Sequence, residues 1–165
     1  GQWTSLRARP FGRVADPQTA PMGLFITAID THPHAANPEI AIARNTEAFV
    51  LGQDLLAAMV ECPVYLCAAP GADVPQSEHA RLVRHDFSGP HPAGLAGTHV
   101  HFLMGASLER IAWTVGYQDV IAIGRLFLDG ALSRTFSRLF HAALIGHLKA
   151  IGNNGRLFSL VAMQP

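Results

Sequence analysis

The chain is poor in cysteine, with two thiols in 165 residues. Cys62 and Cys67 are five residues apart in CPVYLC, and on an extended strand they point to opposite faces, too far apart to form a disulfide. Small secreted domains usually carry several disulfides, so their absence favours a reducing, cytoplasmic compartment. Two thiols also fall short of the four that an iron–sulfur cluster needs. We expect Cys67 to be a small apolar core residue.

An excess of charge of either sign is also missing. Twelve basic and twelve acidic side chains cancel, so the sequence gives no sign of binding to a nucleic acid or an acidic membrane surface. Uncharged apolar runs of about 18 residues, which a membrane span requires, are absent too. Arg125 and Asp129 interrupt the most apolar segment, VIAIGRLFLDGAL. We therefore expect no nucleic-acid partner, and contact with a membrane only through partner proteins.

Apolar residues are abundant, at 49% of the chain against 15% charged, which is typical of a folded domain. Short apolar runs alternate with amphipathic helical patterns, which predicts an α/β fold with a mainly parallel sheet. Strands are predicted at 24–30, 63–68, 81–87 and 109–115, with a short one at 156–163. Helices are predicted at 45–60, 93–103, 117–130 and 134–155.

Proline, glycine and asparagine predict where these elements begin and end. The segment 7–23 is rich in proline and glycine and has no apolar period, so an extended arm or loop is expected. Pro33 and Pro38 should delay the next helix until after Ile40. Asn45 is a candidate N-cap for the helix that follows, and Gly130 is expected to end the helix that begins at YQDV.

The segment SGPHPAGLAGTHVHFLMG, residues 88–105, concentrates histidine, proline and glycine. His99 and His101 would share one face on a strand but diverge by roughly 200° on a helix. A third metal ligand is not nearby, because flexible glycines separate the pair from His91, so a metal site is the weaker alternative. Backbone hydrogen bonding and capping are the simpler roles for these histidines.

The same segment lacks both glycine patterns of nucleotide-binding loops, GxGxxG and GxxxxGK[ST]. Its prolines also remove backbone donors that a phosphate would use. We predict instead a stiff turn followed by a helix of small residues, in which Gly94 and Gly97 let another backbone come close. Ser88 and Ser107 stand outside any nucleophile motif, so no catalytic residue is predicted.

Long strings of the sequence carry a resemblance to a known family. GQWTSLRARPFGRV, FITAIDTHPHAANPEI, DFSGPHPAGLAGTHVHFL and IAWTVGYQDVIAIGRLFLDG follow one another within residues 1–132. Together they resemble the second, α/β domain of NqrA, a subunit of the sodium-translocating NADH:quinone oxidoreductase. The resemblance implies a peripheral protein on the cytoplasmic face of the bacterial inner membrane. Its partners would be the other subunits, especially the membrane subunit NqrB, in a respiratory complex that uses NADH, FAD, FMN, iron–sulfur centres and ubiquinone and exports sodium.

The resemblance further implies a Rossmann-like layered domain, similar to the flavin-binding domain of the NADH-oxidising subunit of complex I but without a tightly bound cofactor. Where that relative has a glycine-rich loop, this chain has SLRARPFGRV, with bulky Leu6, Arg7, Arg9 and Phe11. We therefore expect a scaffold or interaction domain. A flavin- or nicotinamide-nucleotide-binding oxidoreductase domain is the alternative, and a stand-alone metal-binding protein is a weaker one.

The resemblance also suggests a site, because quinone binding is associated with NqrA in this family. The candidates for quinone or subunit contact are Trp3, His91, Pro92, Gly94, Gly97, His99 and His101. Residues 133–165 do not resemble the family. We expect them to form a mainly helical tail, packed on the domain of residues 1–132 and produced by a frameshift or truncation.

Overall fold

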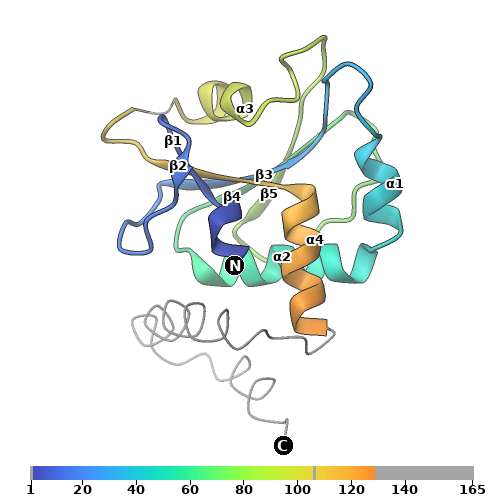
Figure 1. Ribbon diagram of the computed structural model, residues 1–165, viewed down its shortest axis with the longest axis horizontal. Helices are drawn as coiled ribbons and strands as arrows, with labels where there is room; N and C mark the ends of the chain where they lie inside the picture. The colour runs from blue at the N-terminus through green and yellow to red at the C-terminus, as the bar shows by residue number, and fades with distance from the viewer. Residues whose placement is uncertain (1, 106, 129–165) are drawn as a thin grey trace, which may run out of the picture.

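The computed structural model describes residues 2–105 and 107–128 (Figure 1). Within them lies one mixed six-stranded sheet with the strand order β2-β1-β6-β3-β4-β5. Its strands are β1 (Arg7–Arg9), β2 (Arg13–Val14), β3 (Gly23–Ala28), β4 (Val64–Ala68), β5 (Leu82–Asp86) and β6 (Ala112–Gly116). The predicted α/β class is confirmed. The expectations for Gly130 and for residues 133–165 lie outside the described residues.

The centre of the sheet consists of parallel strands. β3 pairs in parallel with β4 on one side and with β6 on the other, and β4 pairs in parallel with β5. Leu24, Phe25 and Ile26 of β3 have no exposed surface, because helices cover both faces of this strand. The short apolar runs predicted to be buried strands therefore form the parallel part of the sheet.

The segment 7–23 contains two short strands, so its prediction as an extended arm or loop was wrong in part. β1 and β2 form an antiparallel hairpin, and β1 also pairs antiparallel with β6, with Arg7 opposite Thr114. The strands have no apolar period of their own. Pairing with β6, which is distant in the sequence, stabilises them through backbone hydrogen bonds.

The helices are η1 (Gln2–Ser5, a 3₁₀ turn), α1 (Pro38–Ala43), α2 (Thr46–Met59), α3 (Ala96–Leu103) and α4 (Tyr117–Leu128). Pro38 does not delay a helix but opens α1 in its first turn, where its missing N–H is not needed. The side chain of Asn37 caps this helix by accepting a hydrogen bond from the Glu39 backbone N–H, 3.0 Å. Asn45 precedes α2, but its Nδ2 donates to the Ala41 carbonyl oxygen at 2.7 Å, so the expected side-chain cap is absent.

The helices form a layer on each side of the sheet (Figure 1). α2 and α4 pack together on one face, over the larger apolar cluster that includes Leu24, Leu56 and Leu66. α3 lies on the other face, where Val100 packs against Phe25 in a smaller cluster. Because α3 is only eight residues long, it covers part of its face and leaves the rest open.

Candidate functional site

A crevice lies where the connections of the sheet change direction. From β3 the chain adds β4 and β5 on one side, and it then crosses back through α3 to place β6 on the other side of β3. Such a switch point leaves a hollow outside the carboxyl ends of the two strands, where open α/β sheets bind ligands. Here the hollow measures about 300 Å³ and is lined by Arg7, Arg9, Thr27, Thr114 and the chain just ahead of α3. We call it the switch-point crevice.

The floor of the crevice is polar because of strand alternation. Phe25 and Ala112 face α3 and pack in the smaller apolar cluster. Two residues further along each strand, Thr27 and Thr114 face the same side, beyond the amino end of α3. Arg7 is the register partner of Thr114, so it also faces the crevice. Apart from Arg9 on β1, the amino half of this sheet face is therefore apolar, and the carboxyl half presents hydroxyl and guanidinium groups.

Two loops meet at the rim of the crevice. The Thr31 hydroxyl oxygen accepts a hydrogen bond from the Gly94 backbone N–H at 2.9 Å and lies 3.3 Å from His91 Nδ1. The rings of His32 and His91 are 4.8 Å apart. A Cβ on Gly94 would lie 2.7 Å from the Thr31 backbone nitrogen, so the close backbone approach expected at Gly94 is confirmed.

Asp30 stands beside these loops, and His32 holds its carboxylate. Asp30 Oδ1 accepts a hydrogen bond from the His32 backbone N–H at 2.9 Å and lies 2.6 Å from His32 Nδ1. The backbone hydrogen bond, followed by the ring contact, lowers the pKa of Asp30 below its usual value. The carboxylate therefore stays charged, and its negative charge is directed to His32.

His99 and His101 diverge, because the segment that carries them is the predicted helix. His99 is fully buried, with its ring 4.3 Å from that of Phe87 and its Nε2 2.9 Å from the Ala93 carbonyl oxygen. Burial lowers the pKa of His99, which favours the neutral ring. His101 is exposed and meets Phe102 edge-on. In the part of the chain that the structure describes, no three or more His, Cys, Asp or Glu side chains are placed to hold a metal ion.

The remaining two candidates of the segment differ in what surrounds them. A Cβ at Gly97 would meet nothing within 4 Å. The expected backbone approach at Gly97 is therefore wrong, because the neighbouring loop reaches the chain ahead of α3 and not the helix itself. Pro92 is exposed, and its carbonyl oxygen accepts a hydrogen bond from Thr98 Oγ1 at 2.9 Å. Both residues shape the start of α3.

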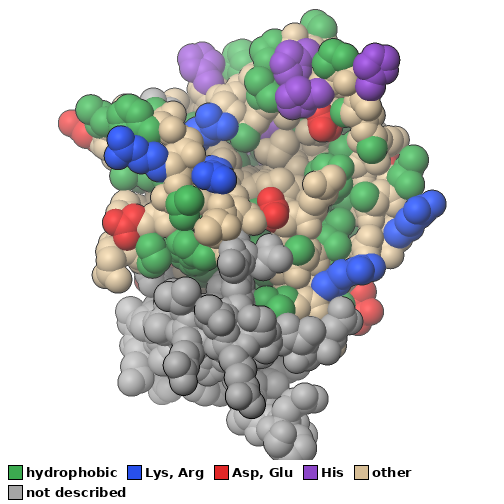
Figure 2. Space-filling view, viewed as in Figure 1, with side chains coloured by type: hydrophobic (Ala, Val, Ile, Leu, Met, Phe, Trp, Pro, Cys, Tyr) green, Lys and Arg blue, Asp and Glu red, His purple; other side chains and the backbone are tan. Residues whose placement is uncertain are grey.

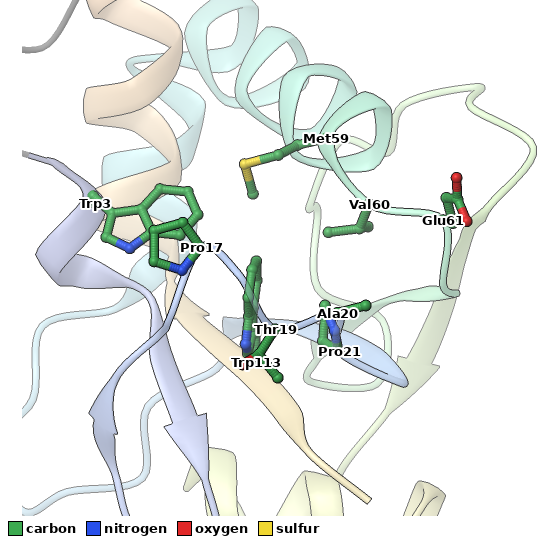
Figure 3. Close-up of a pocket in the computed structure, with 9 residues that line it drawn as sticks. All are labelled: Trp3, Pro17, Thr19, Ala20, Pro21, Met59, Val60, Glu61 and Trp113. Atoms are coloured by element: carbon green, nitrogen blue, oxygen red, sulfur yellow. The ribbon is translucent and has the colours of Figure 1, made fainter. Parts of the chain in front are cut away.

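Trp3 lies apart from the histidines, on the opposite face of the sheet (Figures 1 and 3). Its Nε1 donates to the Ala15 carbonyl oxygen at 2.7 Å, and its ring meets Trp113 edge-on at 5.6 Å. With Met59, the two indoles line a narrow apolar cavity of about 50 Å³ (Figure 3). The structure therefore does not bring Trp3 together with the histidine-bearing segment.

Several residues of the crevice were not singled out as site residues from the sequence. The sequence indicates only that Arg7 and Arg9 are bulky, and that Asp30 ends the predicted strand at 24–30. One signal was available, since the string DTH begins at the last residue of a predicted buried strand and ligands gather at the carboxyl ends of parallel strands. The partner of that string, residues 91–94, is remote in the sequence and gave no such signal.

Comparison with known proteins identifies relatives of the chain. Residues 1–132 match the model of the family described as the NqrA second alpha/beta domain. The A subunit of the Na(+)-translocating NADH-quinone reductase of Shewanella amazonensis is 54% identical over 133 residues, which are 81% of this chain and 29% of the relative. The proteins of the same name from Vibrio campbellii and Vibrio parahaemolyticus are 51% and 50% identical over 132 residues, 80% of this chain and 29% of each relative. The chain thus spans 29% of the length of these curated relatives.

None of the helices described in residues 2–105 and 107–128 has the length and apolar character to cross a membrane.

Proposed function

The chain belongs to the family of the NqrA second alpha/beta domain, and on this basis we propose that it acts as a scaffold and interaction domain within the NqrA part of a sodium-translocating NADH:quinone reductase. The curated relatives carry the name of that component. In this proposal the electron transfer from NADH to quinone and the export of sodium belong to the complex. The isolated chain has no activity of its own, and its partners are the other subunits, above all the membrane subunit NqrB, on the cytoplasmic face.

The start of α4 is the observation that carries the scaffold role. A nucleotide-binding domain of this topology places a glycine-rich turn and a phosphate at the amino end of a helix that follows a central strand. Here β6 ends at Gly116 and α4 begins at the next residue, so no turn separates them. Asp119 stands in the first helical turn, where its carboxylate complements the helix dipole and repels a phosphate. Ser5 Oγ fixes this carboxylate by donating to its Oδ1 at 2.7 Å.

The parallel strands and their switch point support a Rossmann-like relationship to the flavin domain of complex I, which is part of the same proposal. They also favour the alternative function, nucleotide binding by the domain itself, because the crevice occupies the usual ligand position. An absorption spectrum separates the two functions. We expect the purified chain to lack the flavin bands, and to lack them again after incubation with FMN and gel filtration. A stoichiometric flavin that survives gel filtration contradicts the scaffold proposal.

The exposed part of the segment 88–105 is the proposed contact with a neighbouring subunit or with quinone. Phe102 is 72% exposed beside His101, so its ring is accessible to a neighbouring molecule. Ile40 on α1 is 57% exposed and serves as a matched control. In cells that produce the chain together with NqrB, we expect Phe102→Ser to lower the amount of NqrB that co-purifies. Ile40→Ser should leave it unchanged. Equal recovery in both variants contradicts a contact at α3.

Quinone contact has a separate test. A photoreactive quinone analogue added to the assembled complex should label residues within 85–105. Labelling confined to other parts of the chain, or to other subunits, contradicts quinone contact while leaving the subunit contact to the co-purification experiment.

A further inference from the structure

From the switch-point crevice we infer that the domain binds a small oxyanion, the phosphate or carboxylate group of a compound smaller than a dinucleotide. The inference does not depend on the scaffold role, and no electron transfer is involved. It depends on three properties of the crevice: side-chain polar atoms without partners, unpaired positive charge and size.

Two polar side-chain atoms of the crevice have no hydrogen-bond partner. Arg9 Nε and Thr27 Oγ1 are each buried from solvent, and neither bonds to another group of the protein. Both residues line the same hollow. Buried polar atoms in native proteins are almost always paired, and each orphan costs free energy. An N–H donor and a hydroxyl that share a hollow are the groups expected to bind an oxyanion.

The charges around the hollow point to the same ligand class. Arg7 and Arg9 are two residues apart on β1, so their side chains project to the same face of the sheet. Among the described residues neither guanidinium has an ion pair or a hydrogen bond. By contrast, the guanidinium of Arg84 donates to Asp86 and to carbonyl oxygens of its neighbouring loop. Arginine left unpaired in a hollow suits the bidentate recognition of phosphate or carboxylate.

The arginines of the lining outnumber its carboxylates, so the crevice keeps an excess of positive charge. Asp30 is the carboxylate that lines the crevice, and His32 holds it. The amino end of α3 lies at the opposite rim, where Ala96 contributes to the lining and the first helical N–H groups have no intrahelical partners. Figure 2 shows arginine side chains over the β1–β2 hairpin and histidine side chains over the loops across from them, with the surface hollowed between the two groups.

Size limits the ligand. The crevice of about 300 Å³ lies at the lower end of the range for small-molecule sites. The start of α4 already lines the crevice through Gly116 and Tyr117, and Asp119 in the first turn of this helix disfavours the additional phosphates of a dinucleotide. A compact molecule that carries phosphate or carboxylate groups satisfies both limits.

Calorimetric titration of the whole chain with pyrophosphate and with citrate tests the inference. We expect saturable binding of at least one of them, weakened by added salt. Arg9→Gln should weaken it by roughly tenfold, since it removes a charged hydrogen-bond donor. Thr27→Val should weaken it by about threefold and leave the unfolding temperature unchanged or higher, because the buried hydroxyl makes no bond within the protein.

The matched control is Arg13→Gln. It removes the same charge from the same hairpin, but the Arg13 guanidinium lies over the Phe11 ring, 5.5 Å from its centroid, and not in the crevice. Binding should persist in this variant. Absence of saturable binding by the unmodified chain overturns the inference, as does an equal loss in Arg13→Gln and Arg9→Gln.

If Arg9→Gln does not fold, two other variants test oxyanion binding in its place. They are Arg7→Gln, which changes an exposed side chain, and Thr27→Val. The flavin spectrum and the co-purification with NqrB are unaffected by either result. Failure of this inference is therefore distinguishable from failure of the scaffold proposal.

Discussion

Gly124 of α4 lies against the backbone of Ala48 in α2, so closely that a Cβ at Gly124 would be 1.8 Å from the Ala48 carbonyl oxygen. The relationship is reciprocal along the helix pair, since a Cβ at Gly52 of α2 would be 2.2 Å from the Val120 carbonyl oxygen. The two helices therefore pack backbone against backbone on one face of the sheet. Their contact fixes the direction of α4 and, with it, the position of Asp119.

Gly124→Ala tests this contact. The added methyl group has no space and must push the two backbones apart, so we expect a loss of about 3 kcal/mol in the free energy of unfolding. Urea denaturation followed by circular dichroism measures it. Gly97→Ala is the control, because a Cβ at that helical position meets nothing within 4 Å. It should leave stability unchanged or raise it by up to about 1 kcal/mol. Similar effects at the two positions would argue against the close crossing.

His99 makes stability depend on pH. Its pKa is lowered in the folded chain by burial, so between that pKa and the unfolded value of about 6.5 the unfolded chain binds more protons. The contribution of the neutral His99 ring to the unfolding free energy is therefore complete above about pH 6.5 and is lost as the pH falls below this value. His99→Leu should flatten the pH profile of the unfolding free energy in this range, whereas His101→Leu, at an exposed ring, should keep its slope. A His99→Leu profile parallel to that of the unmodified chain would count against this account.

Asp30 titrates at a lower pH than an ordinary aspartate. Hydrogen bonds from His32, that of the backbone N–H first and that of the ring second, lower the pKa of this carboxyl below 3.8. NMR titration of the side-chain carboxyl carbon measures it. His32→Ala removes the ring and keeps the backbone donor, so the pKa of Asp30 should rise only part of the way toward that of an ordinary aspartate. Any stability that Asp30 contributes is present above its unfolded pKa and is lost as the pH falls through the folded one. A value unchanged by His32→Ala would contradict a role for the ring.

Both cysteines should be unreactive in the folded chain. Burial raises the pKa of Cys62 to about 11 and that of Cys67 to about 12, so neither forms appreciable thiolate near neutral pH. Both are free thiols, as their spacing predicted. Ellman's reagent should therefore label neither thiol quickly in buffer, and both in denaturant. Fast labelling without denaturant would show that these side chains are not packed as described.

Local sequence patterns determined the longer helices and the parallel strands, but not η1 or α1. The apolar run around Leu24 predicted a strand covered on both faces. The spacing of Ala48, Leu51, Leu55 and Met59 predicted α2, in which Leu51 is partly buried and the other three side chains are buried. β6 begins at Ala112 and not at residue 109, because the run of buried residues starts with that alanine. Such elements are predictable because each is specified by residues close together in the sequence. The same holds for family membership, which rests on long strings within residues 1–132.

Tertiary structure alone decided the crevice and the edge of the sheet. β1 is held by β6, and Thr114 donates to the Arg7 carbonyl oxygen across 107 residues of sequence. Thr31 and Gly94, which join the two rim loops, are 63 residues apart. No short-range pattern records such pairs, because each partner has ordinary local preferences and only folding places them in contact. The sequence therefore determined what kind of domain this is, and the order of its strands decided where arginine, threonine and histidine side chains could meet.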